Sequence, residues 1–113
     1  MQRNNYVYIE HIKFCIDKIN SFTRGLKEDE FLKDELIQDA VIRNFEVIGE
    51  AVKQLSDDFR KKYNHIPWKD IAGMRDVLIH DYLGVDLWAV WSTVVKYLPD
   101  LEKEILIILE NKA

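Results

Sequence analysis

Hydrophobic residues in the first part of the chain recur at steps of three and four positions, the spacing of one face of an α-helix. They are Ile9, Ile12, Ile16, Ile19 and Phe22. Gly25 follows this pattern, and a glycine just past a helix commonly takes the left-handed conformation that ends it. The pattern predicts an amphipathic helix over 6–23.

A second apolar stripe of helical spacing predicts one continuous helix over about 28–55. Its members are Phe31 or Leu32, Leu36, Ala40, Val41, Phe45, Ile48, Ala51, Val52 and Leu55. The acidic residues at 28–30 suit the positive end of a helix dipole. Gly49 lies within the stripe and costs about 1 kcal/mol of helix propensity relative to Ala. We therefore expect Gly49 to mark a close contact with another helix.

Two shorter segments follow this long one. Ser56 can cap the N-terminus of a short helix over 59–63, and Pro67 can occupy the first position of the next helix. That helix carries Trp68 near its start, and we expect it to fray near His80.

The last apolar pattern predicts a helix from Asp86, its expected N-cap, to about 110. Pro99 lies inside this pattern and lacks an N–H group, so we expect a kink one turn earlier. The chain contains only four Gly and two Pro, which disfavours a protein of many short strands. The sequence therefore predicts an all-α fold with a single domain over 1–113, an antiparallel bundle of four long helices and one short one.

The composition limits the function more than the fold. The 48% hydrophobic and 32% charged residues are typical of a globular protein. A formal net charge of −4 disfavours binding long nucleic acid through bulk positive charge, so such an activity would need a local basic site. The sequence has no apolar run of roughly 18 residues and predicts no membrane helix and no signal peptide. The single Cys15 predicts no disulfide, which fits a cytoplasmic protein, and we expect it to pack in the core.

Three residues at the spacing R-x4-H-x-Y carry the candidate chemistry: Arg75, His80 and Tyr82. The guanidinium group presents a fork of donors that matches phosphate oxygens. An imidazole titrates near neutral pH, so it can take a proton from a 2′-hydroxyl or give one to a leaving oxygen. A tyrosine adds a hydroxyl donor or a ring for base stacking. The pattern is therefore suited to cleaving a phosphodiester.

The spacing alone leaves two interpretations open. Positions five apart on an unbroken helix point about 140° away from each other. Arg75 and His80 therefore converge only if the helix unwinds near His80, or if a second copy of the chain contributes across a dimer interface. In the structural alternative Arg75 pairs with a carboxylate, Glu46 or Glu50, while His80 caps the helix and Tyr82 packs.

A resemblance to a known family favours the catalytic interpretation. The matching stretches lie between 40 and 101: Arg43-Asn44-Phe45-Glu46-Val47-Ile48-Gly49-Glu50-Ala51, Ile66-Pro67-Trp68, Gly73-Met74-Arg75-Asp76-Val77-Leu78-Ile79-His80-Asp81-Tyr82, Val90-Trp91 and Leu98-Pro99-Asp100-Leu101. In this order they resemble the HepT-like HEPN proteins, the toxins of HEPN/MNT toxin–antitoxin pairs. The resemblance covers more than half of the chain.

The resemblance implies a metal-independent endoribonuclease without cofactor, a homodimer of HEPN fold in which two R-x4-H-x-Y motifs line a shared cleft. Arg75 would hold the scissile phosphate, and His80 would act as general base or acid with the 2′-hydroxyl as nucleophile. Asp76 stands where the family often has Asn. It can orient Arg75 or His80, but its negative charge beside phosphate leaves that role open.

The resemblance also implies a partner, a minimal (MNT-type) nucleotidyltransferase that acts as antitoxin. Such antitoxins transfer AMP to the motif tyrosine, here Tyr82, and an anionic group in the cleft would repel RNA phosphate. The rival interpretation is a non-catalytic HEPN module that binds nucleotide or this partner. The acidic net charge and Asp76 favour the rival, whereas the intact Arg75, His80 and Tyr82 favour the enzyme.

Several cations, histidines and tryptophans are further candidates for RNA, metal or packing roles. Five cations close in sequence to the motif can form a basic rim for RNA or a solvated helix surface: Lys53, Arg60, Lys61, Lys62 and Lys69. His11 and His65 have no second ligand at metal spacing, so no metal site is expected. We expect three tryptophans to anchor the core and the dimer interface: Trp68, Trp88 and Trp91.

Overall fold

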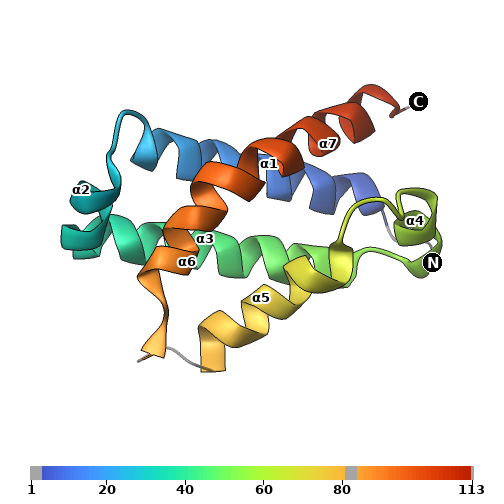
Figure 1. The fold of residues 1–113 in the computed structure, drawn as a ribbon. Coiled ribbons are helices and arrows are strands. Elements are labelled where there is room, and N and C mark those ends of the chain that lie inside the picture. Colours follow the sequence, from blue (N-terminus) through green and yellow to red (C-terminus); the bar gives the residue numbers. More distant parts are fainter. Residues whose placement is uncertain (1–3, 81–83, 113) are drawn as a thin grey trace.

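The computed structural model describes residues 4–80 and 84–112, apart from the side chains of residues 79 and 80. Within these residues the chain is helical and contains no strand, which confirms the all-α prediction (Figure 1). The elements are α1 (Asn5–Thr23), α2 (Glu28–Lys33), α3 (Glu35–Gln54), α4 (Asp57–Lys62), α5 (Trp68–His80), α6 (Leu87–Ser92), the π-helical segment η2 (Thr93–Tyr97) and α7 (Leu98–Glu110).

The core forms where α1, α3 and α7 pack together. In Figure 1, α1 and α3 run alongside each other in opposite directions and α7 crosses over α1. The α1 side chains facing inwards are at most 5% exposed: Ile9, Ile12, Cys15, Ile16 and Ile19. The four isoleucines belong to the stripe predicted from sequence, whereas its fifth member, Phe22, is 38% exposed. Burial raises the pKa of the Cys15 thiol, as expected for a cysteine that packs as a small hydrophobic residue.

Helix ends follow the local capping residues. The Asn4 side chain accepts from the Tyr6 N–H at the start of α1, and Gly25 has φ +73°, the left-handed conformation predicted after it. The Ser56 side chain accepts from the Phe59 N–H at 3.2 Å, so α4 begins at Asp57, two residues before the predicted start.

The predicted continuous helix over 28–55 is wrong, because the chain breaks at Asp34 into α2 and α3. Asp34 has φ −105° and ψ 92°, and its side chain accepts from the Ile37 N–H at 3.1 Å. An aspartate can cap a new helix as readily as it continues an old one. The break turns Phe31 inwards, where it is fully buried and stacks on Trp91 at 5.1 Å. Leu36, placed in the apolar stripe from sequence, is 80% exposed.

The predicted kink before Pro99 is confirmed as a π-helical turn. Asp86 caps α6 by accepting from the N–H groups of Trp88 and Ala89, and the helix then widens over Thr93–Tyr97. Pro99 has no N–H to donate one turn back. The Leu98 N–H donates instead to the Thr93 carbonyl oxygen, five residues earlier, which is the hydrogen bond of a π-bulge.

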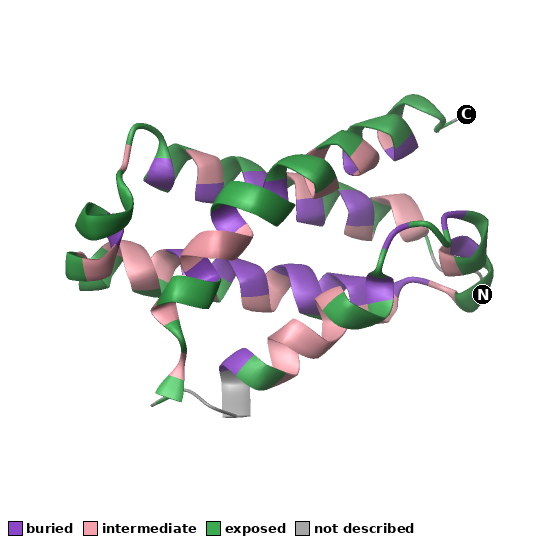
Figure 2. Ribbon diagram, in the orientation of Figure 1, coloured by how far each residue is buried: buried purple, intermediate pink, exposed green. Residues whose placement is uncertain are grey.

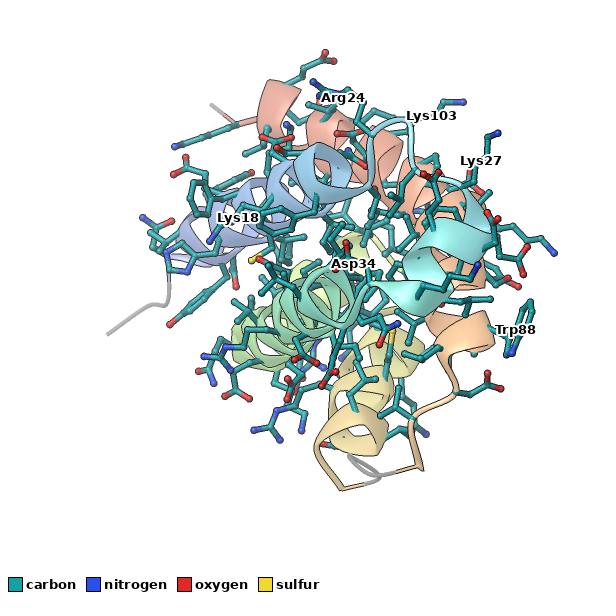
Figure 3. The ribbon with its side chains drawn as sticks, turned by 90° about the vertical axis from the view of Figure 1, so that its left-hand side faces the viewer. Lys18, Arg24, Lys27, Asp34, Trp88 and Lys103 are labelled. Atoms are coloured by element: carbon teal, nitrogen blue, oxygen red, sulfur yellow. The ribbon has the colours of Figure 1, made fainter. Side chains whose placement is uncertain are left out.

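The tryptophans take three different positions. Trp68 is 4% exposed in the core, and Trp91 is half-buried against Phe31. Trp88 is 63% exposed, and Figure 3 shows it pointing away from the rest of the chain. The prediction that Trp88 anchors the core is therefore wrong, while a role at a dimer interface stays a prediction.

Burial differs strongly between the two long helices that pack on α3. Figure 2 shows buried positions along the inner faces of α1 and α3, whereas α5 is half-buried over most of its length. All six residues at 71–76 are of intermediate exposure. Helix α5 is the element that carries the candidate motif.

Candidate active site on helix α5

Helix α5 crosses α3 at Gly49. A Cβ at Gly49 would lie 2.3 Å from the Arg75 Cβ and 3.2 Å from the Ile71 carbonyl oxygen, far closer than packed atoms allow. This confirms the close helix contact predicted for Gly49. The absence of a side chain at Gly49 is what lets Arg75 lie directly against α3.

The Arg75 guanidinium is held by two carboxylates. Its Nε lies 3.1 Å from Glu50 Oε2, and its Nη1 lies 3.1 Å from Asp76 Oδ1. The Glu50 pairing is one of those considered from sequence. The Arg75 side chain is 29% exposed, so solvent still reaches the group. Arg75 is therefore fixed in orientation and remains accessible.

Asp76 accepts from a second cation as well. Lys53 Nζ lies 2.6 Å from Asp76 Oδ1, the same oxygen that meets Arg75. Hydrogen bonds from Lys53 and then from Arg75 hold the pKa of Asp76 below its ordinary value. The site thus contains two cations and two carboxylates, from α3 and α5, in one connected network.

Of the remaining motif residues, only the backbone of His80 is described, as the last residue of α5. The described part of this helix extends to His80, and the expected fraying there stays a prediction. The side chain of His80 and the whole of Tyr82 lie outside the described residues, so the convergence of Arg75 with His80 stays a prediction.

The predicted basic rim divides into two parts. Lys53 joins the Arg75 network. Arg60, Lys61 and Lys62 lie on α4, which Figure 1 places near the start of α5, at the opposite end from His80. Lys69 is exposed in the first turn of α5. The structure therefore brings Lys53 to the motif and leaves the α4 cations apart from it.

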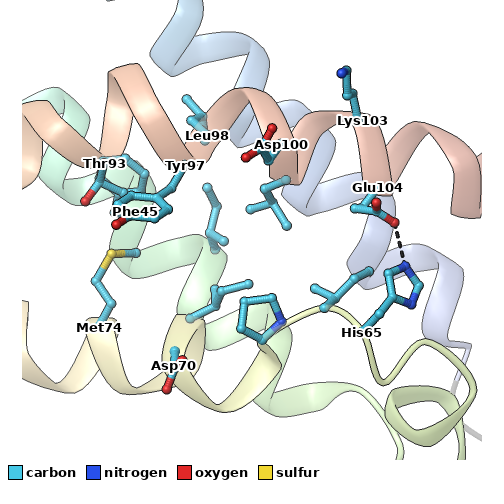
Figure 4. Close-up of a pocket in the computed structure, with 15 residues that line it drawn as sticks. Phe45, His65, Asp70, Met74, Thr93, Tyr97, Leu98, Asp100, Lys103 and Glu104 are labelled. Atoms are coloured by element: carbon cyan, nitrogen blue, oxygen red, sulfur yellow. Dashed lines mark hydrogen bonds and ion pairs between the residues drawn. The ribbon is translucent and has the colours of Figure 1, made fainter.

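A groove of about 840 Å³ runs between α5 and the η2–α7 segment. Its lining includes Phe45 and Ile48 of α3 and the apolar side chains of Met74, Tyr97 and Leu101. Figure 4 shows the groove in close-up. At one end His65 Nε2 and Glu104 Oε2 are 2.6 Å apart. Sequence reasoning missed this groove, since no local pattern shows that α5 packs on α3 without closing against α7.

Within 4–80 and 84–112 no three His, Cys, Asp or Glu side chains are grouped so as to hold a metal ion. In the same part of the chain no helix is long and apolar enough to cross a membrane.

The sequence model of the family described as "Ribonuclease HepT-like" matches residues 12–108, which include Gly49, Lys53, Arg75 and the rest of the motif. The chain belongs to the HepT-like ribonuclease family. The match spans α1 to α7, so the core and the α3–α5 crossing both lie within the HepT-like region.

Individual relatives agree with this membership. The HepT-like chain is 44% identical to "Probable ribonuclease HepT" of Thermococcus cleftensis, over 90% of this chain and 93% of that protein. It is 43% identical to a "Putative RNase" of Caldanaerobacter subterraneus, over 93% and 94%. It is also 49% identical to a "Gamma-glutamylcyclotransferase and putative RNase" of Methanocaldococcus jannaschii, over 98% of this chain but only 50% of that longer protein. No solved structure matches.

Proposed function

We propose that this chain is a metal-independent endoribonuclease, the toxin of a cytoplasmic toxin–antitoxin pair, with Arg75, His80 and Tyr82 as its catalytic residues and Asp76 in a positioning role beside them. The observation that carries this proposal is the accessible Arg75 guanidinium, fixed at the α3–α5 crossing in a HepT-like chain. A charge that is held in place before substrate arrives stabilises a transition state without further reorganisation.

The chemistry follows from the residue types. His80 takes the proton of the RNA 2′-hydroxyl, whose oxygen forms a bond to phosphorus while the bond from phosphorus to the 5′-oxygen breaks. That 5′-oxygen takes up a proton, and the other product carries a 2′,3′-cyclic phosphate. Arg75 offsets the charge that develops on the phosphate oxygens. No step needs a metal ion.

The active species is proposed to be a homodimer. On a helix, residues 75 and 80 point about 140° apart. Arg75 and His80 can therefore act on one phosphate only if the helix unwinds near His80 or if a second copy contributes one of them. Apolar surface beside the motif supports the second copy: Tyr97 is 64% exposed at the groove, and Val77 is 57% exposed at a smaller pocket that shares Phe45 and Met74 with it. A dimer would remove this surface from water.

The proposed partner is a minimal nucleotidyltransferase antitoxin that transfers AMP to Tyr82. In the sequence, Tyr82 lies two positions after His80, the last described residue of α5. An added adenylate there would place negative charge beside the phosphate site and repel RNA. Mass spectrometry of Tyr82 after co-expression with the neighbouring gene tests this step, and an unmodified tyrosine would contradict it.

Purified protein incubated with RNA in excess EDTA tests the main proposal, beside His80→Ala. The wild type is expected to cleave in EDTA, and His80→Ala is expected to lose at least a hundredfold in rate. Cleavage that stops with chelator would contradict the metal-free mechanism. Equal cleavage by the variant would contradict the role of His80.

A second candidate function is a non-catalytic module that binds nucleotide or the nucleotidyltransferase. The observation that favours it is the pairing of Arg75 with both Glu50 and Asp76, because a phosphate must compete with these carboxylates. RNA or nucleotide binding with no cleavage by the wild type would select this function.

A further inference from the structure

Lys53 differs from the other cations predicted to line an RNA site, because it contacts the motif itself. It reaches from α3 to Asp76 on α5, 23 positions away, with Nζ 2.6 Å from Oδ1. Arg60, by comparison, pairs with Asp57 within its own helix. Lys53 thus bridges two helices and contacts the residue next to Arg75, whereas a solvated surface lysine would make no such contact.

The contact brings two positive groups together. Lys53 Nζ and Arg75 Nη1 both donate to Asp76 Oδ1. The distance between the two nitrogens therefore cannot exceed the sum of these two hydrogen-bond lengths. Like charges at this separation repel each other. The ionised Asp76 offsets that repulsion, and hydrogen bonds from both cations hold its pKa low.

Both cations keep donors for a ligand. A lysine ammonium has three donors and an arginine five. Neither described contact of Arg75 uses Nη2, and the side chains of Lys53 and Arg75 are 34% and 29% exposed. A phosphate that approaches Arg75 can therefore accept from Lys53 as well, and Arg and Lys side chains are among the groups that contact phosphate oxygens in nucleic-acid complexes.

We propose that Lys53 is a second phosphate-binding residue of the RNA site, and that Asp76 is the positioning residue that holds Lys53 beside Arg75. The inference rests on the proposed RNA-cleaving function, but it adds a residue outside the R-x4-H-x-Y motif. It also gives Asp76 a definite role: its negative charge holds two cations together rather than opposing the substrate.

The dependence of RNA binding on salt tests the proposal. A short single-stranded RNA is titrated with His80→Ala protein, which binds without cutting, at several salt concentrations. Each phosphate contact from a cation contributes about 0.7 to the slope of log K against log salt for a single strand. Lys53→Met is expected to lower the slope by about this amount for each Lys53 in the complex, and Lys53→Arg to restore it.

Lys13→Met is the matched control. Lys13 is also paired with an aspartate, Asp17, but both lie on α1, which does not carry the motif. Its substitution removes the same charge and should leave the slope unchanged. An equal drop in both variants would mean that net charge, not contact, sets the slope, and would overturn the assignment.

The remaining outcomes separate this inference from the proposed function. If the His80→Ala protein binds RNA and Lys53→Met leaves the slope unchanged, the role of Lys53 is wrong while the nuclease proposal stands. If His80→Ala binds no RNA and the wild type cuts none, the proposed function fails and the inference fails with it. A folded Lys53→Met protein, judged by its thermal transition, is required for either result.

Discussion

Helices α1 and α5 both pack along α3, yet they contribute different things to the molecule. α1 contributes a row of isoleucines that are fully buried. α5 is half-buried in its middle, meets α3 through Gly49, and carries charged groups on the contact. Burial of apolar area is the dominant source of stability, whereas polar groups at a wet interface contribute little net free energy. The fold therefore depends mainly on the α1–α3 side, and the candidate site lies on the α5–α3 side.

The largest expected effect on stability is that of truncating a buried isoleucine of α1, compared with the same truncation on α5. Ile12 of α1 is fully buried, and Ile12→Ala should lower the free energy of unfolding by about 2–5 kcal/mol. Ile71 of α5 is only half-buried at the groove, so Ile71→Ala should cost about 1 kcal/mol or less in the monomer. Urea unfolding of both variants gives the comparison.

The same pair of variants reports on the groove. If a second copy covers the groove, the cost of Ile71→Ala should grow with protein concentration, because association stabilises only the folded state. The cost of Ile12→Ala should not depend on concentration. If the cost of Ile71→Ala stays constant as the protein concentration rises, a second copy does not cover the groove. If it equals the cost of Ile12→Ala, the contrast between α1 and α5 is wrong.

The next effect uses two helical glycines with opposite surroundings. Gly49→Ala places a Cβ 2.3 Å from the Arg75 Cβ, next to the backbone of α5, so the two helices must move apart. We expect a loss of about 1–3 kcal/mol, despite the gain in helix propensity, and a large loss of RNA cleavage. Gly73 has no atom within 4 Å of such a Cβ, so Gly73→Ala should stabilise the protein by about 0.5–1 kcal/mol. A stabilising Gly49→Ala would contradict the close contact.

Much of the fold can be predicted from local sequence signals. Gly25, Asp86 and Pro99 each act on the backbone within one turn of their own position, so the end of α1, the start of α6 and the kink are readable without tertiary information. The break at Asp34 is not, because an aspartate suits both a helix interior facing water and an N-cap. What decides it is the burial of Phe31 against Trp91, sixty positions away in the chain.

The candidate site divides in the same way. The motif on α5 and the pairing of Arg75 with Glu50 could be proposed from spacing and charge. The contact of Lys53 with Asp76 could not, since it depends on how α5 lies across α3 and on the reach of a long side chain. The groove depends on how α5 and the η2–α7 segment lie relative to each other, which no local pattern encodes.

The smallest expected effect is the pH dependence contributed by Asp76 on the α5 side. Its pKa is lowered in the folded protein, chiefly by the hydrogen bond from Lys53, so the ionised form is the stabilised one. The stabilisation is therefore fully present above the pKa of an unfolded aspartate, about 3.9, and is lost as the pH falls through the lowered value in the folded state. In urea unfolding, the free energy of unfolding of the wild type should exceed that of Asp76→Asn at neutral pH. This difference should shrink below about pH 4.

Removing Lys53 sharpens this measurement. Because Lys53 is the main cause of the lowered pKa, the difference between Asp and Asn at position 76 should be smaller in a Lys53→Met background, as a double-mutant cycle would show. A difference that grows as the pH falls, or one that is unaffected by Lys53→Met, would contradict the network. The charged residues between α3 and α5 would then act as independent surface charges. Asp76 would not be the group that holds the two cations together.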